Sequence, residues 1–415
     1  MADHTAVDLT VTEDGRTDLA AMGDSFTRDP YPVYAALRER GPVHRVRTPE
    51  GFDAWLVVGH EAARQALTDA RLSKAWANAS PGTGIRIVSP GPHMLIADPP
   101  DHTRLRKLIA RHFTPRRIAA LEPRVREITE GLLDAMLALP GGRADLVDTL
   151  AFPLPISVIG ELLGVPVADR ERFRAWTDDL LGVTPQDDKQ AAARALTQYL
   201  AQLIERRREE PADDLFSALI GDGDSDTGAE GPEAALSREE LLGTAWLLLI
   251  AGYETTVGLI ANGVLALLLH PEQLAALRAD ASLLEGAVEE ALRYDGPVEV
   301  ATSRFTTEPV LIGDTLIPGD GRLVLPVLAD AGRDPERFGD PDRFDIRRGP
   351  RGHLAFGHGI HFCLGAPLAR LEGRVAFERL LARAPKLELD AAPEGLRWRD
   401  GLLMRGVTSL PVRFG

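Results

Sequence analysis

Apolar residues recur along most of the chain at the three- and four-residue spacing that places them on one face of a helix. This pattern predicts helices at residues 118–139, 155–164, 190–209, 236–268 and 272–294. Alternation of apolar with polar residues is confined to short segments, and it predicts strands at residues 54–58, 309–312, 315–317 and 323–327. A mainly α fold with a small β-rich lobe follows from this balance.

The polar segments set the expected domain boundaries. Residues 1–25 are polar and contain no apolar run, so we expect neither a signal peptide nor a membrane anchor there. The longest strongly apolar stretch, residues 245–251, is too short to cross a bilayer. Residues 221–232 form a connector with aspartates at calcium-loop offsets, but Thr227 replaces the glycine that such a loop needs. We therefore expect a single domain over residues 26–415.

Composition narrows the class of protein. The 415 residues are 44% hydrophobic and 26% charged, which is ordinary for a soluble enzyme. The net charge of -15 argues against nucleic acid as a partner. Cys363 is the only cysteine, so a disulfide framework and a cysteine-rich metal site are excluded. A single reduced thiol without an export signal indicates the cytoplasm.

That cysteine lies in a glycine-rich loop, Phe356-Gly357-His358-Gly359-Ile360-His361-Phe362-Cys363-Leu364-Gly365. The glycines allow a tight loop to bring its backbone close to a flat molecule and to turn N–H groups toward the sulfur, which stabilises a thiolate. Such a thiolate suits axial coordination of haem iron. A small buried apolar cysteine would not need these glycines. A dinucleotide-binding loop is not indicated, because Phe362 stands where its last glycine belongs.

The loop resembles the haem-binding loop of the cytochrome P-450 monooxygenases, and the resemblance extends from Asp29-Pro30-Tyr31 to the C-terminus. It implies a triangular, mainly α cytochrome P-450 fold with a small β-rich lobe. It also implies haem b as cofactor, with Cys363 as the thiolate ligand and Phe356, Gly357 and Gly365 as neighbours of the haem. The expected reaction is the insertion of oxygen from O2 into an unactivated C–H bond of a hydrophobic small molecule.

A second constellation, Ala251-Gly252-Tyr253-Glu254-Thr255-Thr256, lies inside the longest predicted helix. Gly252 costs helix stability and Glu254 puts a charge into an apolar element, so a purely structural helix gains nothing from them. The segment resembles the oxygen-binding groove of the same family. On that resemblance Ala251 and Gly252 leave a gap free of side chains, Thr255 forms a hydrogen bond during oxygen activation, and Glu254 supplies protons. A threonine that bonds only to its own helix is the structural alternative.

Two further sets of charged residues fit the resemblance. Glu290 and Arg293 form a pair across one helical turn that matches the family's Glu-x-x-Arg, and we expect Arg343 to be its third partner rather than Arg337. These residues are structural. The cations expected to pair with the two haem propionates are His102, Arg106, Arg304 and His361.

The substrate is less well defined by the sequence. Residues 44–51 and 353–356 resemble actinobacterial enzymes that hydroxylate macrolides and other polyketides, while terpenoids, fatty acids and peptides remain as alternatives. The loop at residues 79–97 should border the pocket. It contains one cation, Arg86, and no carboxylate before Asp98, which favours a neutral substrate. The residues expected to line the pocket are Ile85, Ile87, Val88, Met94, Leu95, Leu248, Val298, Glu299, Val300 and Leu403.

The electrons must come from another protein, because 415 residues leave no room for a fused flavin domain and no nucleotide-binding motif is present. By resemblance we expect a ferredoxin and a ferredoxin reductase. Residues 102–117 contain six Lys or Arg and no acidic residue, and this basic stretch could bind an acidic ferredoxin. A haem-thiolate sensor, a peroxygenase that uses peroxide and, most remotely, a binding protein without haem are the alternatives.

Overall fold

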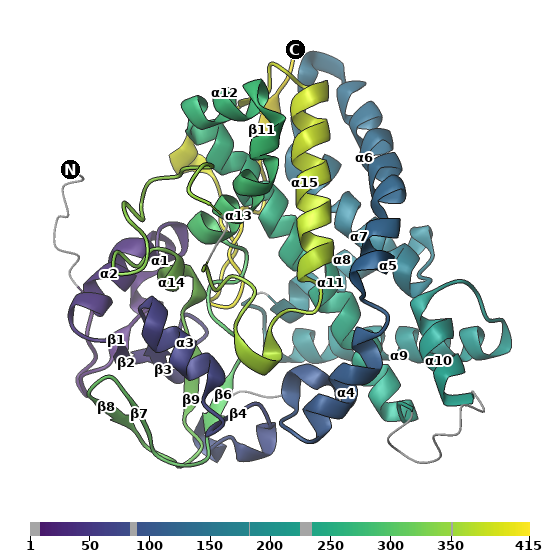
Figure 1. Ribbon diagram of the computed structural model, residues 1–415. Coiled ribbons are helices and arrows are strands. Elements are labelled where there is room, and N and C mark those ends of the chain that lie inside the picture. The colour runs from purple at the N-terminus through teal and green to yellow at the C-terminus, as the bar shows by residue number, and fades with distance from the viewer. Residues whose placement is uncertain (1–8, 84–88, 182, 225–234, 350–351) are drawn as a thin grey trace.

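The computed structural model describes residues 9–83, 89–181, 183–224, 235–349 and 352–415. Its outline is roughly triangular (Figure 1). Most of the strands gather at one corner together with the short helices near the N-terminus, and the long helices fill the rest. The expected mainly α, triangular fold with a small β-rich lobe is confirmed.

The described helices are α1 Asp24–Arg28, α2 Tyr31–Glu39, α3 His60–Thr68, α4 Asp101–Ala110, α5 Pro115–Ala120, α6 Glu122–Leu137, α7 Pro153–Leu163, α8 Arg170–Leu181, α9 Gln186–Glu209, α10 Leu215–Asp224, α11 Arg238–Leu269, α12 Pro271–Ala279, α13 Leu284–Asp295, α14 Leu328–Gly332 and α15 Ala366–Arg383. The longest of them, α11, crosses the molecule behind α15 (Figure 1). It packs against α7, α13, α15 and α9, so it forms the centre of the main hydrophobic core.

The strands form three sheets. The largest has the order β1-β2-β3-β9-β6-β4, a small one has the order β10-β11-β5, and β7 pairs with β8 as a hairpin. Their bounds are β1 Thr17–Asp18, β2 Val43–Arg47, β3 Asp53–Val57, β4 Leu72–Ser73, β5 Arg143–Asp145, β6 Arg304–Thr306, β7 Val310–Ile312, β8 Thr315–Ile317, β9 Leu323–Pro326, β10 Glu388–Leu389 and β11 Pro411–Arg413. Parallel pairing of β3 with β9 joins segments that lie far apart in the sequence.

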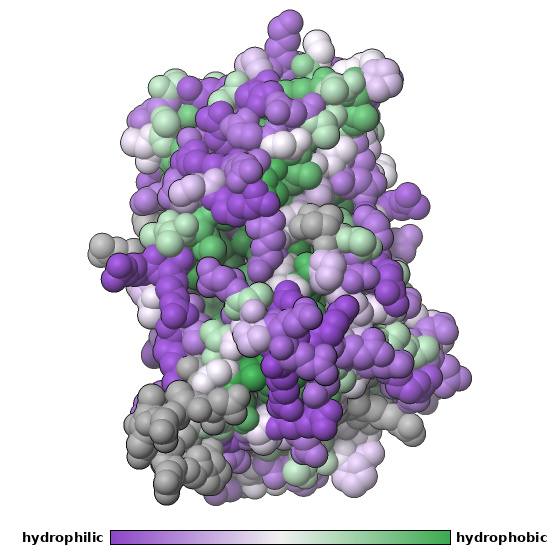
Figure 2. Space-filling view, turned by 90° about the vertical axis from the view of Figure 1, so that its right-hand side faces the viewer, coloured by the Kyte–Doolittle hydropathy of each residue, from purple (hydrophilic) through white to green (hydrophobic). Residues whose placement is uncertain are grey.

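Local sequence explains where α11 begins. The Ser237 hydroxyl accepts a hydrogen bond from the Glu240 N–H while the Glu240 carboxylate accepts one from the Ser237 N–H, which is a complete capping box. Contrary to the expectation from the sequence, this helix is long and apolar enough to cross a membrane. Its most apolar window is 83% buried inside the protein, so α11 is a core helix. Figure 2 shows one face of the molecule, on which hydrophilic residues dominate and hydrophobic ones form only scattered patches.

Two predicted helices are divided in the structure. Residues 272–294 form α12 and α13, because Asp280 leaves the helical conformation and its carboxylate accepts a hydrogen bond from the Ser282 N–H. Residues 118–139 are divided at Leu121, where α5 ends before Pro123 starts the first turn of α6. Within the polar segment expected at residues 1–25, Leu19 is buried against the large sheet and β1 pairs with β2.

Candidate active site

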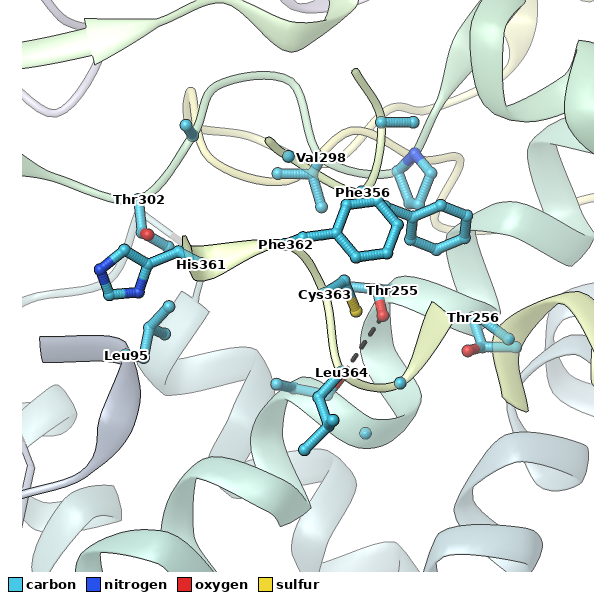
Figure 3. Close-up of a pocket in the computed structure, with 18 of the residues that line it drawn as sticks. Leu95, Thr255, Thr256, Val298, Thr302, Phe356, His361, Phe362, Cys363 and Leu364 are labelled. Atoms are coloured by element: carbon cyan, nitrogen blue, oxygen red, sulfur yellow. Dashed lines mark hydrogen bonds between the residues drawn. The ribbon is translucent and has the colours of Figure 1, made fainter. Parts of the chain in front are cut away.

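A large pocket lies between α11, the start of α15 and the loop that carries Cys363. It contains about 1470 Å³ of space free of protein atoms, part of it open to solvent. Leu95, His361, Phe362 and Cys363 lie along one side of it, and Thr255 and Thr256 project from α11 (Figure 3). Most of the described side chains that line it are apolar. It can therefore enclose a large and mostly apolar molecule.

The cysteine loop has the backbone that its glycines predict. Gly357 has φ +72° and Gly359 has φ +75°, a left-handed conformation that favours glycine. Gly365 has φ -79°, an angle that any residue can adopt. A Cβ at this position would lie 3.8 Å from the Cys363 sulfur, which is an ordinary contact distance, so neither the backbone angle nor the space requires glycine here. Burial raises the pKa of the Cys363 thiol, while the N–H groups of Gly365 and Ala366 lower it. Cys363 lines the pocket, so the surface that it exposes lies inside the protein and not on its outer face.

Basic side chains gather at one side of this pocket. The rings of His102 and His361 lie 4.3 Å apart, and neither ring nitrogen of the buried His102 has a hydrogen-bond partner. Arg106 donates a hydrogen bond to the Phe362 carbonyl at 2.7 Å, and the buried Arg304 donates one to the Thr302 carbonyl at 3.2 Å. The structure thus brings together all four residues that were expected to hold the propionates.

Lys74 is a fifth basic residue in this group, and the sequence did not indicate it. Its side chain is buried, and Nζ donates to the Thr302 carbonyl at 3.0 Å and to the Ser303 carbonyl at 2.7 Å. Burial and the neighbouring cations, Lys74 first among them, lower the pKa of His361 to about 2. Burial also lowers the pKa of Arg304 to about 10. A pair of carboxylates between these side chains would relieve both effects.

Helix α11 presents two different faces. Ala251, Gly252, Thr255 and Thr256 line the large pocket, as one helix face should. The Thr255 hydroxyl donates to the Ala251 carbonyl at 3.2 Å (Figure 3). This is the bond that the structural alternative predicts, but the hydroxyl remains at the pocket surface.

Gly252 has a second neighbour besides the pocket. A Cβ at Gly252 would lie 2.7 Å from Cγ1 of Ile159, so α7 packs against the bare backbone of α11 at this point. Ile159 itself lines the pocket. Gly252 therefore lines the pocket and also allows a close approach of two helices.

Glu254 lies on the other side of α11. It lines a second cavity, which holds about 990 Å³ of space free of protein atoms, part of it open to solvent, and it does not line the large pocket. Arg399 Nη2 lies 3.1 Å from its Oε2. Burial raises the pKa of the Glu254 carboxyl, and Arg399 opposes that rise.

The Glu290–Arg293 pair is buried, with Nε and Nη2 of Arg293 each 2.7 Å from a carboxylate oxygen of Glu290. The prediction that the Arg343 side chain completes the pair is wrong. That side chain is 63% exposed, and Arg343 contributes its backbone carbonyl, which accepts from Arg293 at 3.1 Å. Arg348 provides the third side chain, with Nε 3.3 Å from Glu290 Oε1. Because Arg343 faces outward on its loop, only the folded structure reveals this exchange.

Four of the residues predicted for substrate contact line the large pocket: Met94, Leu95, Leu248 and Val298. Three lie elsewhere. Glu299 is buried and accepts a hydrogen bond from Tyr34, Val300 packs in the core of the sheet, and the Leu403 carbonyl accepts from the Glu299 N–H. Ile85, Ile87 and Val88 lie outside the described residues.

Comparison with known proteins decides the family. Residues 176–384 match the family described as cytochrome P-450. The chain is 57% identical over 399 residues to the cytochrome P-450 monooxygenase PikC of Streptomyces venezuelae, an alignment that covers 96% of this chain and 94% of the relative. The chain belongs to the cytochrome P-450 family.

Two further comparisons extend over nearly the whole P-450. It is 46% identical over 403 residues to 6-deoxyerythronolide B hydroxylase of Saccharopolyspora erythraea, with 94% of this chain and 97% of the relative covered. The solved structure of the P-450 monooxygenase TamI with tirandamycin C bound has a TM-score of 0.87 and 45% identity, and covers 96% of this chain and 100% of that chain. The protein is thus a monooxygenase.

The cofactor of this P-450 is haem, and the residues present fit it. In the described part of the chain no group of three or more His, Cys, Asp or Glu could hold a metal ion. Cys363 lies at the pocket wall, where it would supply a single sulfur ligand to the haem iron. The basic side chains of the pocket fit two propionates, because Asp98, the carboxylate that acts on Arg304, already accepts hydrogen bonds from Ser73 and the Lys74 N–H.

Proposed function

We propose that this P-450 hydroxylates an unactivated C–H bond of a large, neutral, mostly apolar natural product of the macrolide or polyketide class. One observation carries the substrate class. The described side chains that line the large pocket include a single carboxyl group, that of Glu372, which lies on α15 near the cysteine loop. A cationic amino sugar would need a buried counter-charge in this pocket. The relatives that act on macrolides and polyketides support the same class.

Neither Glu299 nor Asp178 lines the large pocket, so neither can pair with a cationic substrate there. Glu299 is turned toward Tyr34 and away from the pocket. Asp178 lines the second cavity, where Arg399 lies 3.3 Å from it. A neutral macrolactone held by shape and by hydrogen bonds to its hydroxyl groups is therefore the better fit.

When bound, the haem supplies oxygen activation and the oxidation of the C–H bond. Cys363 would bind the iron, and His102, Arg106, Arg304 and His361 would hold the propionates. The Thr255 hydroxyl lies at the pocket surface, where it would offer a hydrogen bond during oxygen activation. Glu254 takes up protons from the second cavity on the far side of α11.

The electrons come from a separate ferredoxin and ferredoxin reductase in the cytoplasm. Ile360, in the cysteine loop, is 51% exposed, and Lys107 is exposed on the neighbouring α4. We propose that an acidic ferredoxin binds this face. Arg104, also in the basic stretch, faces the interior instead, where it pairs with Glu240 of the α11 capping box.

The substrate class is tested by titrating the haem spin-state change with matched macrolides that differ only in a neutral or an amino sugar, followed by mass spectrometry of the products. Tighter binding of the neutral compound and a product heavier by one oxygen atom are expected. A clear preference for the amino sugar would overturn the substrate class while leaving the monooxygenase assignment intact.

The role of Thr255 is tested by comparing Thr255→Ala with the control Thr255→Ser, which keeps the hydroxyl group. Both variants should bind haem and substrate. Thr255→Ala should divert reducing equivalents to hydrogen peroxide, so that less product forms per NAD(P)H consumed, whereas Thr255→Ser should retain most of the coupling. Equal coupling in both variants would assign Thr255 only the bond to the Ala251 carbonyl.

A further inference from the structure

Glu254 belongs to a cluster of polar groups that lies behind α11, away from the large pocket. Arg174, Asp178, Arg399 and Asp400 line the same second cavity. The Glu254 side chain is almost fully buried at its inner end, while Asp178 is half exposed. The cavity therefore connects solvent with the one carboxylate of α11 that lies behind the pocket.

Arg399 stands between two carboxylates. Its Nη2 lies 3.1 Å from Glu254 and its Nη1 lies 3.3 Å from Asp178. The backbone at this point is fixed, because the Arg399 N–H donates to the Gly406 carbonyl at 2.8 Å and Trp398 forms a β-bridge with Val407. A guanidinium group on a fixed turn is thus held between α11 and α8.

Helix α8 also contacts Glu254 directly. The Thr177 hydroxyl lies 3.5 Å from Glu254 Oε1, and it shares a short hydrogen bond with the Tyr253 hydroxyl. Thr177 bonds in addition to the Phe173 carbonyl one turn earlier in α8, at 2.9 Å. Two successive residues of α8, Thr177 and Asp178, therefore act on the carboxylate of α11, one through a hydroxyl and the other through Arg399.

We propose that Arg399 and Asp178 are positioning residues for Glu254, and that together they set the orientation of its carboxylate and the pH at which it takes up a proton from the second cavity. The inference rests on the proposed role of Glu254 in proton supply. It also links Glu254 to α8, because a movement of Asp178 with α8 would change how closely Arg399 pairs with Glu254.

The charged groups around Glu254 predict opposite effects. Burial raises the pKa of Glu254, Arg399 and the more distant Arg174 lower it, and Asp178 raises it. Arg174 is itself paired with Asp148 at 2.7 Å. Removing the charge of Arg399 should therefore raise the pKa of Glu254. Removing the charge of Asp178 should lower it, both directly and because Arg399 is then left to Glu254 alone.

The experiment reads the carboxyl group itself. In the haem-loaded protein, the infrared band of a protonated carboxyl that is lost in Glu254→Gln is followed as a function of pH. Arg399→Gln should move the midpoint of this titration upward by about 1 pH unit or more. Asp178→Asn should move it downward by less, since Asp178 is half exposed. Arg399→Lys keeps the positive charge, so the midpoint should return most of the way to that of the parent protein. The control is Arg397→Gln, an exposed residue of the same turn, which should leave the midpoint unchanged.

Coupled turnover against pH provides the second readout. Loss of product per NAD(P)H at high pH should follow the infrared midpoint in each variant, while haem content and the substrate-induced spin change stay as in the parent. If Glu254→Gln leaves the pH profile of coupling unaltered, the proposed role of Glu254 in proton supply fails. If Glu254→Gln alters the profile but the Arg399 and Asp178 variants shift the midpoint in the same direction, or not at all, the positioning inference fails alone.

Discussion

Replacing Arg293 with alanine should abolish stable haem binding. The guanidinium makes two hydrogen bonds to Glu290, each of 2.7 Å, and donates to the carbonyls of Gly332, Pro341 and Arg343 at 2.6, 2.8 and 3.1 Å. Removing one partner of a buried ion pair costs about 3–5 kcal/mol. Each buried carbonyl left without a donor adds about 1–3 kcal/mol unless water replaces the arginine. Even the lower figure is a large part of a typical folding free energy of about 5–15 kcal/mol.

The neighbouring arginines provide a graded comparison. Arg348→Ala removes a bond of 3.3 Å to the same Glu290 and the bonds that this guanidinium donates to the carbonyls of Gly339, Asp340 and Arg343. Its side chain is 16% exposed, so that water can replace part of these bonds, and about 1–2 kcal/mol is expected. Arg343→Ala removes a 63% exposed side chain whose nearest carboxylate is 3.8 Å away, and it keeps the carbonyl that binds Arg293. A change within about 0.5 kcal/mol is expected there.

Haem content per chain after purification, and loss of the Soret band in denaturant, measure the series. The expected order of destabilisation is Arg293→Ala first, Arg348→Ala second and Arg343→Ala last. An Arg343→Ala variant as damaged as Arg293→Ala would refute the assignment of Arg348 as the third side chain at Glu290.

Three further predictions concern other parts of the molecule. Gly252→Ala should lower the free energy of unfolding by about 1–3 kcal/mol, because its Cβ would lie 2.7 Å from Ile159. The double mutant with Ile159→Ala should lose less stability than the sum of the losses in the two single mutants. Glu299 has a pKa of about 7 against 4.5 for a free glutamate, so the folded state holds this proton more tightly. Stability should therefore fall as pH rises from about 4.5 to about 7, by up to about 1.4 kcal/mol per unit, and Glu299→Gln should remove that slope in denaturant titrations. Lys107→Glu should slow reduction by an acidic ferredoxin and weaken its salt dependence, while Lys386→Glu, with the same charge change elsewhere, should not; equal effects would argue against the proposed docking face.

The sequence was most informative where a function depends on neighbouring residues. The cysteine loop carries its ligand and its two left-handed glycines within ten residues, so the local pattern was sufficient. The apolar spacing of α11 and its capping box also lie within one segment. Periodicity alone did not mark the division at Asp280, although an aspartate followed by Ser282 is a typical helix start.

The missed residues are those that reach the site through tertiary contacts. Lys74 follows β4, and it joins the cations of the pocket only because β4 pairs with β6 beside Arg304. Arg399 reaches Glu254 from a turn near the C-terminus. Arg343 was misassigned because its motif does not reveal which way the side chain points. Lys74 and Arg399 bind partners that lie more than a hundred residues away, and the role of Arg343 depends on the direction of its side chain. The spacing of residues along the sequence reveals neither property.

The last strand has a consequence for how the chain can fold during synthesis. β11 is the central strand of its small sheet, between β10 and β5, and β5 lies more than two hundred residues earlier. Arg405, from the preceding turn, pairs with Asp295 and also donates to the carbonyls of Thr27 and Arg28. β5 therefore has no partner on this side until residues 411–413 have left the ribosome, and the region around Arg28 waits almost as long. A nascent chain can therefore complete this sheet and the contacts of Arg405 only after residues 405–413 have been synthesised.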